Sequence, residues 1–416
     1  MAIETRNPAT EEVLERFDPL TDEAIDKALN TAARAFQHFR LTDIAKRARW
    51  LNNTADLLEA EVNEWAAVLT TEMGKTLSAA VAEVKKSAQG CRYYATHGEQ
   101  FLANEPLDSN GTNNFVRHLP LGPVLAVMPW NFPFWQVFRF AAPALIAGNV
   151  GLLKHASNVP RSALAIQNIL ERAGFPEGTF QTLLIGSDQV QQVLTDSRVR
   201  AATLTGSDAA GRAVASVAGH ALKPTVLELG GADPFIVMPS ADLSHAVEAA
   251  VVGRTINNGQ SCIAAKRFIV HSDVYDEFTD RFVSAFENLK VGDPTSDATD
   301  IGPLAMAKIR DDIDEQVIHS TALGAKILTG AEPMSGQGYF YRPGILAQIP
   351  ESAPAYTEEV FGPVAMLFRV SNLDEAIKVS NATRFGLGSA IFTRDQQDID
   401  RATDELDAGA TFVNQI

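Results

Sequence analysis

The chain has 416 residues, which exceeds one compact hydrophobic core and predicts two or three domains. Hydrophobic residues make up 46% and charged residues 21%, as in an ordinary globular protein. The excess of 51 acidic over 35 basic residues gives a net charge of −16, which argues against a nucleic-acid partner.

The N-terminal segment 1–12 has neither a basic region nor an apolar stretch, and no apolar run reaches the length of a membrane span. The chain has two cysteines, Cys91 and Cys262, and a chain of this length does not need a disulfide. We therefore expect a cytoplasmic protein with no membrane partner. Cys91 lies in a helical pattern and is expected to be a small core residue.

The N-terminal third changes its pattern twice along the chain. Residues 1–20 predict an extended lead-in, and residues 21–102 show the periodicity of long helices. Residues 111–127 then predict a β-hairpin that turns at about 119–122 and could mediate association.

Strands and helices alternate from residue 124 onward, which predicts a doubly wound parallel sheet. The expected strands are 124–128, 150–153, 180–185, 201–204 and 226–229. The expected helices follow Pro133 and begin at Pro160 and Ser207. A second α/β series runs from Pro234 to the end, and Gly230 and Gly231 are expected to form the hinge between the two series.

The stretch 258–264 places one cysteine, Cys262, directly after a Gly-Gln turn. A cysteine thiolate is a nucleophile for carbonyl carbon. Upstream, Glu228 ends an apolar strand, where burial between Leu227 and Leu229 would make the carboxylate a base for water. One helix and one loop separate the cysteine from the acid, which is enough chain for both side chains to return to one cleft.

Other strand ends carry groups that suit a dinucleotide, because ligands of open α/β sheets bind beyond the carboxyl ends of the strands. Lys154 and Ser157 follow one strand, and the uncharged Ser157 favours NADP over NAD because an acid there would repel a 2′-phosphate. Ser207 begins a helix after Gly206, where backbone N–H groups can hold a pyrophosphate. Each motif is weak alone: the first pair could be surface residues, and Ser207 could be a simple helix cap.

Asn131 lies in a turn between two prolines, and its amide could donate to an oxyanion or to its own turn. Trp135 and Arg139 share a face of the next helix, where a cation can anchor a substrate carboxylate. The alternative for Arg139 is an ion pair with an acid on a neighbouring helix. The eight histidines, among them His118 and His155, lack the spacing of metal ligands and are expected to be solvated or capping.

Six motifs occur in a fixed order along the chain. They are PWNFP at 129–133, TGS at 205–207, LELGG at 227–231, NNGQSCIAAKR at 257–267, EEVFGPV at 358–364 and NATRFGLGSAIFT at 381–393. As an ordered set, they make the chain resemble the aldehyde dehydrogenase superfamily over nearly its whole length.

The resemblance implies the α/β fold of that family. A Rossmann-type cofactor domain is expected over 1–110 and 126–228, a catalytic domain over 229–416, and an oligomerisation hairpin over 111–125. The family pattern implies a homodimer or a dimer of dimers. Family members continue past the position of Asn414 to a strand that joins a neighbouring subunit's hairpin, and we expect that strand to be absent from this chain.

The resemblance also implies a role for each matching residue. Cys262 is expected to be the nucleophile, Glu228 the general base and Asn131 the oxyanion donor. Cofactor contacts are expected from Met128, Pro129, Trp130, Lys154, Ser157, Thr205, Gly206, Ser207, Leu229, Glu359 and Phe361. The family commonly has glutamate in place of Ser157, which again favours NADP, with NAD as the weaker alternative. Substrate contacts are expected from Arg139 and Trp135.

Arg139 matches an arginine of succinate-semialdehyde dehydrogenases, and the run around Cys262 is similar to their shorter bacterial branch. A second arginine found in one branch corresponds to Ile256, with Arg254 two residues earlier. Some members carry a second cysteine where this chain has Ala264, so the redox switch that such a pair forms is not expected.

The expected function is oxidation of succinate semialdehyde to succinate with NADP⁺, through a thiohemiacetal and a thioester on the cysteine. One alternative is a dehydrogenase of another small or carboxylated aldehyde. An alternative from a different class is a cofactor-independent cysteine esterase or thioesterase.

Overall fold

The computed structural model describes residues 3–108, 111 and 113–416, which fold into two compact units. Unit 1 comprises Met1–Asn7, Glu12–Met73 and Ala80–Glu228, and unit 2 comprises Pro8–Glu11, Gly74–Ala79 and Leu229–Ile416. The last crossing between the units therefore falls directly after Glu228. Among the described residues, no helix combines the length and the apolar character needed to cross a membrane.

The N-terminal part of the chain forms a ribbon followed by four helices. The predicted extended lead-in pairs with itself as the antiparallel strands β1 (Ile3–Arg6) and β2 (Val13–Phe17). The predicted helices are confirmed as α1 (Asp22–Phe39), α2 (Ile44–Ala60), α3 (Val62–Met73) and α4 (Leu77–Phe101). Helix α1 begins where it does because the Thr21 hydroxyl accepts a hydrogen bond from the Ala24 N–H.

The predicted doubly wound sheet of unit 1 is confirmed as five parallel strands in the order β7-β6-β5-β8-β9. The strands are β5 (Pro123–Met128), β6 (Val150–His155), β7 (Phe180–Thr182), β8 (Ala201–Thr205) and β9 (Thr225–Glu228). The connecting helices are α5 (Trp135–Ile146), α6 (Pro160–Arg172), α7 (Val190–Thr195) and α8 (Asp208–His220). The strand order reverses between β5 and β8, and this is where open sheets of this type bind ligands.

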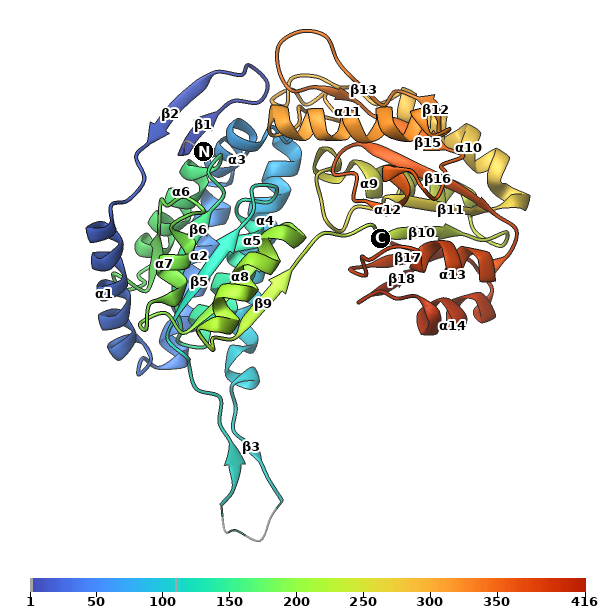
Figure 1. The fold of residues 1–416 in the computed structure, drawn as a ribbon. Coiled ribbons are helices and arrows are strands. Elements are labelled where there is room, and N and C mark those ends of the chain that lie inside the picture. The colour runs from blue at the N-terminus through green and yellow to red at the C-terminus, as the bar shows by residue number, and fades with distance from the viewer. Residues whose placement is uncertain (1–2, 109–110, 112) are drawn as a thin grey trace. The chain divides into compact units, whose positions relative to one another are not determined.

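The hairpin before β5 differs from the prediction in the position of its turn. Its strands are β3 (Glu105–Pro106) and β4 (Phe115–Val116), and Figure 1 shows this ribbon extending away from the five-stranded sheet. The predicted turn at 119–122 is wrong, because that segment leads directly into β5. The Asn149 side chain accepts hydrogen bonds from the N–H groups of Leu121 (2.7 Å) and Gly122 (3.2 Å), which holds the segment against the sheet.

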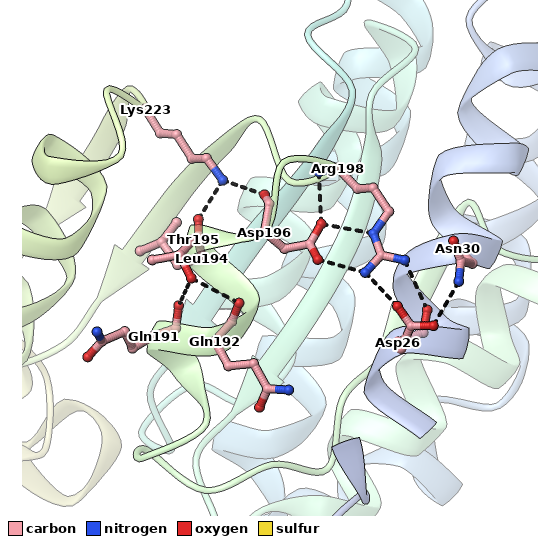
Figure 2. Close-up of polar contacts among 9 residues, drawn as sticks. All are labelled: Asp26, Asn30, Gln191, Gln192, Leu194, Thr195, Asp196, Arg198 and Lys223. Atoms are coloured by element: carbon pink, nitrogen blue, oxygen red, sulfur yellow. Dashed lines mark hydrogen bonds and ion pairs between the residues drawn. The ribbon is translucent and has the colours of Figure 1, made fainter. Parts of the chain in front are cut away.

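The loop between α7 and β8 is fixed by charged contacts (Figure 2). Arg198 binds both carboxylate oxygens of Asp196, at 2.8 and 2.6 Å, and also reaches Asp26 on α1 at 2.8 Å. The guanidinium holds the pKa of Asp196 below its ordinary value. Lys223 donates to the carbonyls of Leu194 (2.6 Å) and Asp196 (2.5 Å). These contacts join α1, α7 and the segment before β9 at the start of β8.

Unit 2 is built on a seven-stranded sheet in the order β12-β15-β16-β11-β10-β17-β18, parallel except for the β12–β15 pair. Its strands are β10 (Pro234–Val237), β11 (Arg267–His271), β12 (Lys326–Thr329), β15 (Gly344–Ala347), β16 (Val364–Val370), β17 (Ser389–Phe392) and β18 (Thr411–Val413); a small ribbon adds β13 (Glu332–Pro333) and β14 (Tyr341–Arg342). Its helices are α9 (Leu243–Thr255), the 3-10 turn η1 (Ile256–Gly259), α10 (Ser272–Glu287), α11 (Ala307–Ala322), α12 (Pro354–Thr357), α13 (Leu373–Asn381) and α14 (Gln396–Glu405).

Helices cover both faces of this sheet, so alternate strand residues enter two separate cores. In β10, Phe235 and Val237 enter the core that includes Phe278 of α10. Ile236, between them, enters the other core, which is formed with α11, α13 and α14. This two-sided burial explains why the strands are apolar throughout rather than alternating.

Candidate active site

The carboxyl ends of the unit 1 strands bring most of the predicted cofactor and catalytic residues of that unit to one sheet edge. Asn131 follows β5, Ser157 follows β6, Ser207 follows β8, and Glu228 is the last residue of β9. Because all these strands are parallel, their carboxyl ends meet at the same edge. Lys154 lies on β6 itself, one residue before its end.

A buried histidine supports the loop that carries Asn131. His155 Nε2 is 2.9 Å from the Pro133 carbonyl, and its Nδ1 accepts a hydrogen bond from the Ala156 N–H at 2.9 Å. Nε2 must therefore donate, so the ring is the neutral tautomer. Burial lowers the pKa of His155 to about 4. The prediction of a solvated or capping side chain is wrong for His155, which supports the loop of Asn131 from within the core.

Glu83 on α4 fixes the start of the helix that carries Arg139. Its side chain is buried and accepts hydrogen bonds from the N–H groups of Phe134 (2.8 Å) and Trp135 (3.0 Å). Phe134 is the N-cap residue of α5 and has no capping side chain of its own, so this distant carboxylate performs that role. The sequence analysis missed Glu83, although an acid inside an otherwise apolar helical stripe is a usable signal.

Arg139 lies beside the proposed base. Its Nη1 is 3.8 Å from Glu228 Oε2, and its Nη2 donates to the Thr205 hydroxyl at 3.2 Å. The alternative predicted for Arg139 was an ion pair with an acid on a neighbouring helix. The acid beside it is instead Glu228, which lies on a strand and is the proposed base. The Glu228 side chain is 40% exposed, so the apolar burial expected between its two leucine neighbours is not found. Both residues line a hollow of about 510 Å³ in unit 1, together with Met128 and Gln136.

The residues proposed to bind the cofactor in unit 1 differ in their surroundings. Lys154 is 9% exposed, burial lowers its pKa, and it has no ion pair with any described residue of this unit. The Ser157 carbonyl accepts a hydrogen bond from the Glu4 N–H, so β1 runs alongside this strand end. Ser207 caps α8 by accepting from the Ala210 N–H at 3.3 Å. A Cβ added to Gly206 would meet nothing nearer than 3.7 Å, so the backbone at this helix start is open to a ligand.

In unit 2, Cys262 follows a left-handed stretch of backbone. Asn257, Asn258 and Gly259 have φ values of 57°, 57° and 76°. The Asn258 side chain donates to the carbonyls of Gly74 and Pro303, both at 3.0 Å. A Cβ on Gly259 would lie 2.4 Å from the Gly362 carbonyl carbon. Asparagine and glycine are the residues that tolerate this conformation, which explains the Asn-Asn-Gly run before the cysteine.

A buried lysine holds the backbone on both sides of Cys262. Lys266 is fully buried, and its Nζ donates to the carbonyls of Ser261 (2.9 Å), Cys262 (2.9 Å) and Ala264 (3.2 Å). The same Nζ lies 3.3 Å from Glu359 Oε1. Burial lowers the pKa of Lys266, and the Glu359 carboxylate opposes that effect. The sequence analysis quoted Lys266 only as part of a motif and assigned it no role.

Glu359 connects the lysine to the double glycine that opens unit 2. Its Oε1 accepts a hydrogen bond from the Gly231 N–H at 3.1 Å. A Cβ on Gly230 would lie 2.5 Å from Glu359 Oε2, and one on Gly231 would lie 2.5 Å from the Cys262 carbonyl oxygen. A side chain at Gly231 would clash with backbone, and one at Gly230 would displace the Glu359 carboxylate. This close approach is a more specific reason for the two glycines than the hinge that the sequence suggested.

Two of the predicted cofactor residues of unit 2 line a hollow, whereas Arg254 is enclosed in the protein. Glu359 and Phe361 line one hollow of about 460 Å³, which also includes Gln316 and His319. Arg254 is fully buried and donates to the Gly259 carbonyl at 2.6 Å, and burial lowers its pKa to about 9. Arg254 is therefore a support of the cysteine loop and does not replace the arginine missing at Ile256.

The proposed catalytic residues are divided between the units, with Asn131 and Glu228 in unit 1 and Cys262 in unit 2. Cys91 is fully buried, and burial raises its pKa to about 12, so Cys262 is the thiol suited to attack a carbonyl carbon. Among the described residues, no cluster of three or more histidine, cysteine or acidic side chains could hold a metal ion. These are the types of group that a cysteine-dependent enzyme with a dinucleotide cofactor requires.

Comparison with known proteins identifies the class more closely. The model of the aldehyde dehydrogenase family matches residues 1–416, and the chain belongs to this family. The chain is 56% identical over 418 residues to the succinate-semialdehyde dehydrogenase (NADP+) of Mycobacterium avium strain 104, covering 100% of this chain and 89% of that protein. It is 55% identical to the succinate-semialdehyde dehydrogenase (NADP+) 1 of Mycobacterium tuberculosis strain H37Rv, covering 100% and 91%.

A solved structure is similar over the same range. It is the succinic semialdehyde dehydrogenase from Streptococcus pyogenes in complex with NADP⁺, with a TM-score of 0.97 at 36% identity. The alignment covers 100% of this chain and 91% of the other. The predicted family and the predicted aldehyde-dehydrogenase-like fold are therefore confirmed.

The geometry of the cysteine loop predicts that Gly259→Ala is strongly destabilising. The added Cβ would combine a left-handed φ with a backbone clash, so we expect the free energy of unfolding to fall by about 2 kcal/mol or more. Gly219→Ala in α8 is the matched control, because a Cβ there meets nothing within 4 Å. The control should change stability by less than about 1 kcal/mol. Equal urea midpoints for both variants would contradict the proposed close approach at Gly259.

The burial of His155 predicts a pH-dependent contribution to stability. Its pKa falls from 6.5 to about 4 on folding, so its contribution is complete above pH 6.5 and is lost as the pH falls towards 4. The full loss is about 3 kcal/mol. Urea unfolding of the wild type and His155→Gln should therefore show a stability difference that shrinks between pH 7.5 and pH 5. A difference that stays constant would show that His155 titrates normally in the folded protein.

Proposed function

We propose that this chain oxidises succinate semialdehyde to succinate with NADP⁺. The observation that carries the proposal is Arg139, a cation 3.8 Å from the Glu228 carboxylate within one hollow of unit 1. A guanidinium beside the base can bind a substrate carboxylate by a bidentate pair of hydrogen bonds. The names of the two mycobacterial relatives support the same substrate and cofactor.

The residues of the chain account for the steps of this reaction. The Cys262 thiolate attacks the aldehyde carbon, and the resulting oxyanion accepts hydrogen bonds from the Asn131 amide and the Cys262 backbone N–H. When bound, NADP⁺ would supply the hydride acceptor that allows the thiohemiacetal on Cys262 to become a thioester. Glu228 then removes a proton from water, the hydroxide attacks the thioester carbon, and the C–S bond breaks to release succinate and the thiolate.

The residues proposed for the cofactor suit an anionic dinucleotide. Lys154 supplies a cation with no carboxylate partner among the described residues of unit 1, and Ser157 adds a hydroxyl without a negative charge. Ser207 and the start of α8 would face the pyrophosphate, with Met128, Pro129, Trp130, Thr205 and Gly206 beside them. Glu359 and Phe361, with Leu229, would hold the nicotinamide end. We propose that these groups favour NADP⁺ over NAD⁺.

Association into a homodimer or a dimer of dimers is part of the proposal. The segment that contains the β3–β4 ribbon exposes apolar side chains at Leu107, Phe115, Val116, Leu119 and Leu121. Exposed apolar side chains gathered in one segment are typical of an interface. A cytoplasmic location is also proposed, supported by the free thiols of Cys91 and Cys262.

A substrate and cofactor panel tests the proposed reaction. The absorbance of the reduced nicotinamide should rise only when both succinate semialdehyde and NADP⁺ are added. Cys262→Ala should reduce turnover by about 10³-fold or more while NADP⁺ still binds. Ester or thioester hydrolysis without cofactor, in the absence of aldehyde oxidation, would support the cysteine hydrolase instead. Retained turnover in Cys262→Ala would reject the nucleophile.

Cofactor preference is tested at Ser157. Ser157→Glu places a carboxylate where the 2′-phosphate is proposed to bind, so kcat/KM for NADP⁺ should fall by about 10-fold or more relative to that for NAD⁺. Ser157→Ala is the matched control, since it removes the hydroxyl without adding charge and should shift the ratio less. An unchanged ratio in Ser157→Glu would place the 2′-phosphate elsewhere.

A further inference from the structure

Lys86 lies on α4 against the helix that carries Arg139, and the proposed reaction assigns it no role. Its Nζ is 4.6 Å from the centroid of the Trp135 ring. The same ring packs close to Gly90, where an added Cβ would lie 3.1 Å from the Cζ3 atom of Trp135. Lys86 and Gly90 are four residues apart and share one face of α4. The indole therefore lies against this face, below the lysine.

The position of Trp135 beneath Lys86 is fixed by Glu83. Glu83 lies one turn before Lys86 on the same face of α4 and accepts hydrogen bonds from the N–H groups of Phe134 and Trp135. Hydrogen bonds to a buried carboxylate are among the stronger ones in proteins. They fix the first turn of α5 against α4, so the contact between the lysine and the indole is built into the helix pair.

The Lys86 side chain lies between the Trp135 ring and solvent. It is exposed, and its ammonium forms no ion pair with any described residue of this unit. Arg139, in contrast, is engaged by Glu228 and Thr205. Contact with a π face leaves the ammonium donors of Lys86 available to an anion.

We propose that Lys86 is a second substrate-binding residue, whose ammonium contacts the carboxylate of the aldehyde substrate together with Arg139. This inference rests on the proposed oxidation of succinate semialdehyde. Trp135 and Arg139 are one helical turn apart, about 5.4 Å along α5, so the lysine and the arginine serve the same end of that helix. The indole supplies an apolar wall for the methylene groups between the carboxylate and the aldehyde. Together the two cations select ω-carboxylated aldehydes over neutral ones.

Steady-state kinetics of the full chain with succinate semialdehyde and with butanal, its uncharged four-carbon counterpart, test the proposal. Lys86→Met keeps the length of the side chain and removes its charge. We expect kcat/KM for succinate semialdehyde to fall by about 10- to 100-fold through KM, and that for butanal to change by less than about 3-fold. Lys86→Arg should restore most of the loss. Lys85→Met, at the exposed neighbour, is the matched control and should resemble the wild type.

The outcomes distinguish the two proposals. Equal losses for both aldehydes in Lys86→Met would mean that Lys86 only supports Trp135, and no loss for either would mean that it does not contact the substrate. An equal effect of Lys85→Met would show that these lysines attract the anionic substrate only through their general positive charge, which would overturn the specific contact. If the wild type oxidises butanal but not succinate semialdehyde, the proposed substrate fails, and this inference fails with it.

A double-mutant cycle with Arg139→Met adds a readout that a structural role would not produce. If both cations contact one carboxylate, their effects on KM for succinate semialdehyde should be non-additive, whereas their effects on butanal should be small or additive. Strict additivity with the charged aldehyde would overturn the shared contact.

Discussion

The buried ammonium of Lys266 is the interaction on which the cysteine site depends. An ammonium removed from water costs several kcal/mol unless its donors are satisfied. Here they are satisfied by three carbonyls around Cys262 and by the Glu359 carboxylate. Movement of the loop that carries Cys262 would leave this buried charge without its partners. The same carboxylate accepts from Gly231, so the start of unit 2 is tied to the loop as well.

Unit 1 uses two buried polar side chains in a comparable way. Neutral His155 holds the loop of Asn131 by donating to the Pro133 carbonyl, and ionisable Glu83 holds the start of α5 by accepting two backbone N–H groups. Neither contacts the reacting atoms in the proposed mechanism. Each satisfies backbone groups that a loop or helix end would otherwise leave without partners. The proposed oxyanion donor and the proposed carboxylate anchor are therefore positioned by residues distant from them in sequence.

Charged groups beside α5 bring the proposed substrate anchor close to the proposed base. Arg139 reaches Glu228 and Thr205, while Trp135, one turn earlier, supports Lys86 from α4. A substrate carboxylate can compete with Glu228 for the guanidinium, which would leave Glu228 available as the base. The same arrangement would connect the choice of an acidic aldehyde to the step that releases its product.

Local pattern was sufficient for much of the fold and for the identity of the chemical groups. The strands that precede Asn131, Lys154, Ser207 and Glu228 were correctly predicted, because buried parallel strands are continuous apolar runs bounded by turn residues. Ser207 was recognised as a helix start by its local capping chemistry. The hairpin turn was misplaced, because its position depends on Asn149, which lies about 30 residues later and binds the backbone at Leu121.

By itself, the sequence determined the order of the motifs, the family that they define, and the residue types that can act as nucleophile, base and oxyanion donor. Only the tertiary structure decided which polar residues are buried and what they contact. Lys266, His155 and Arg254 look like ordinary surface residues in the sequence, since no local pattern around them distinguishes a buried polar group from a solvated one. Their roles depend on backbone groups brought to them by other parts of the chain. Arg254 supports a loop because the fold encloses it, whereas Arg139 remains partly exposed and open to a ligand.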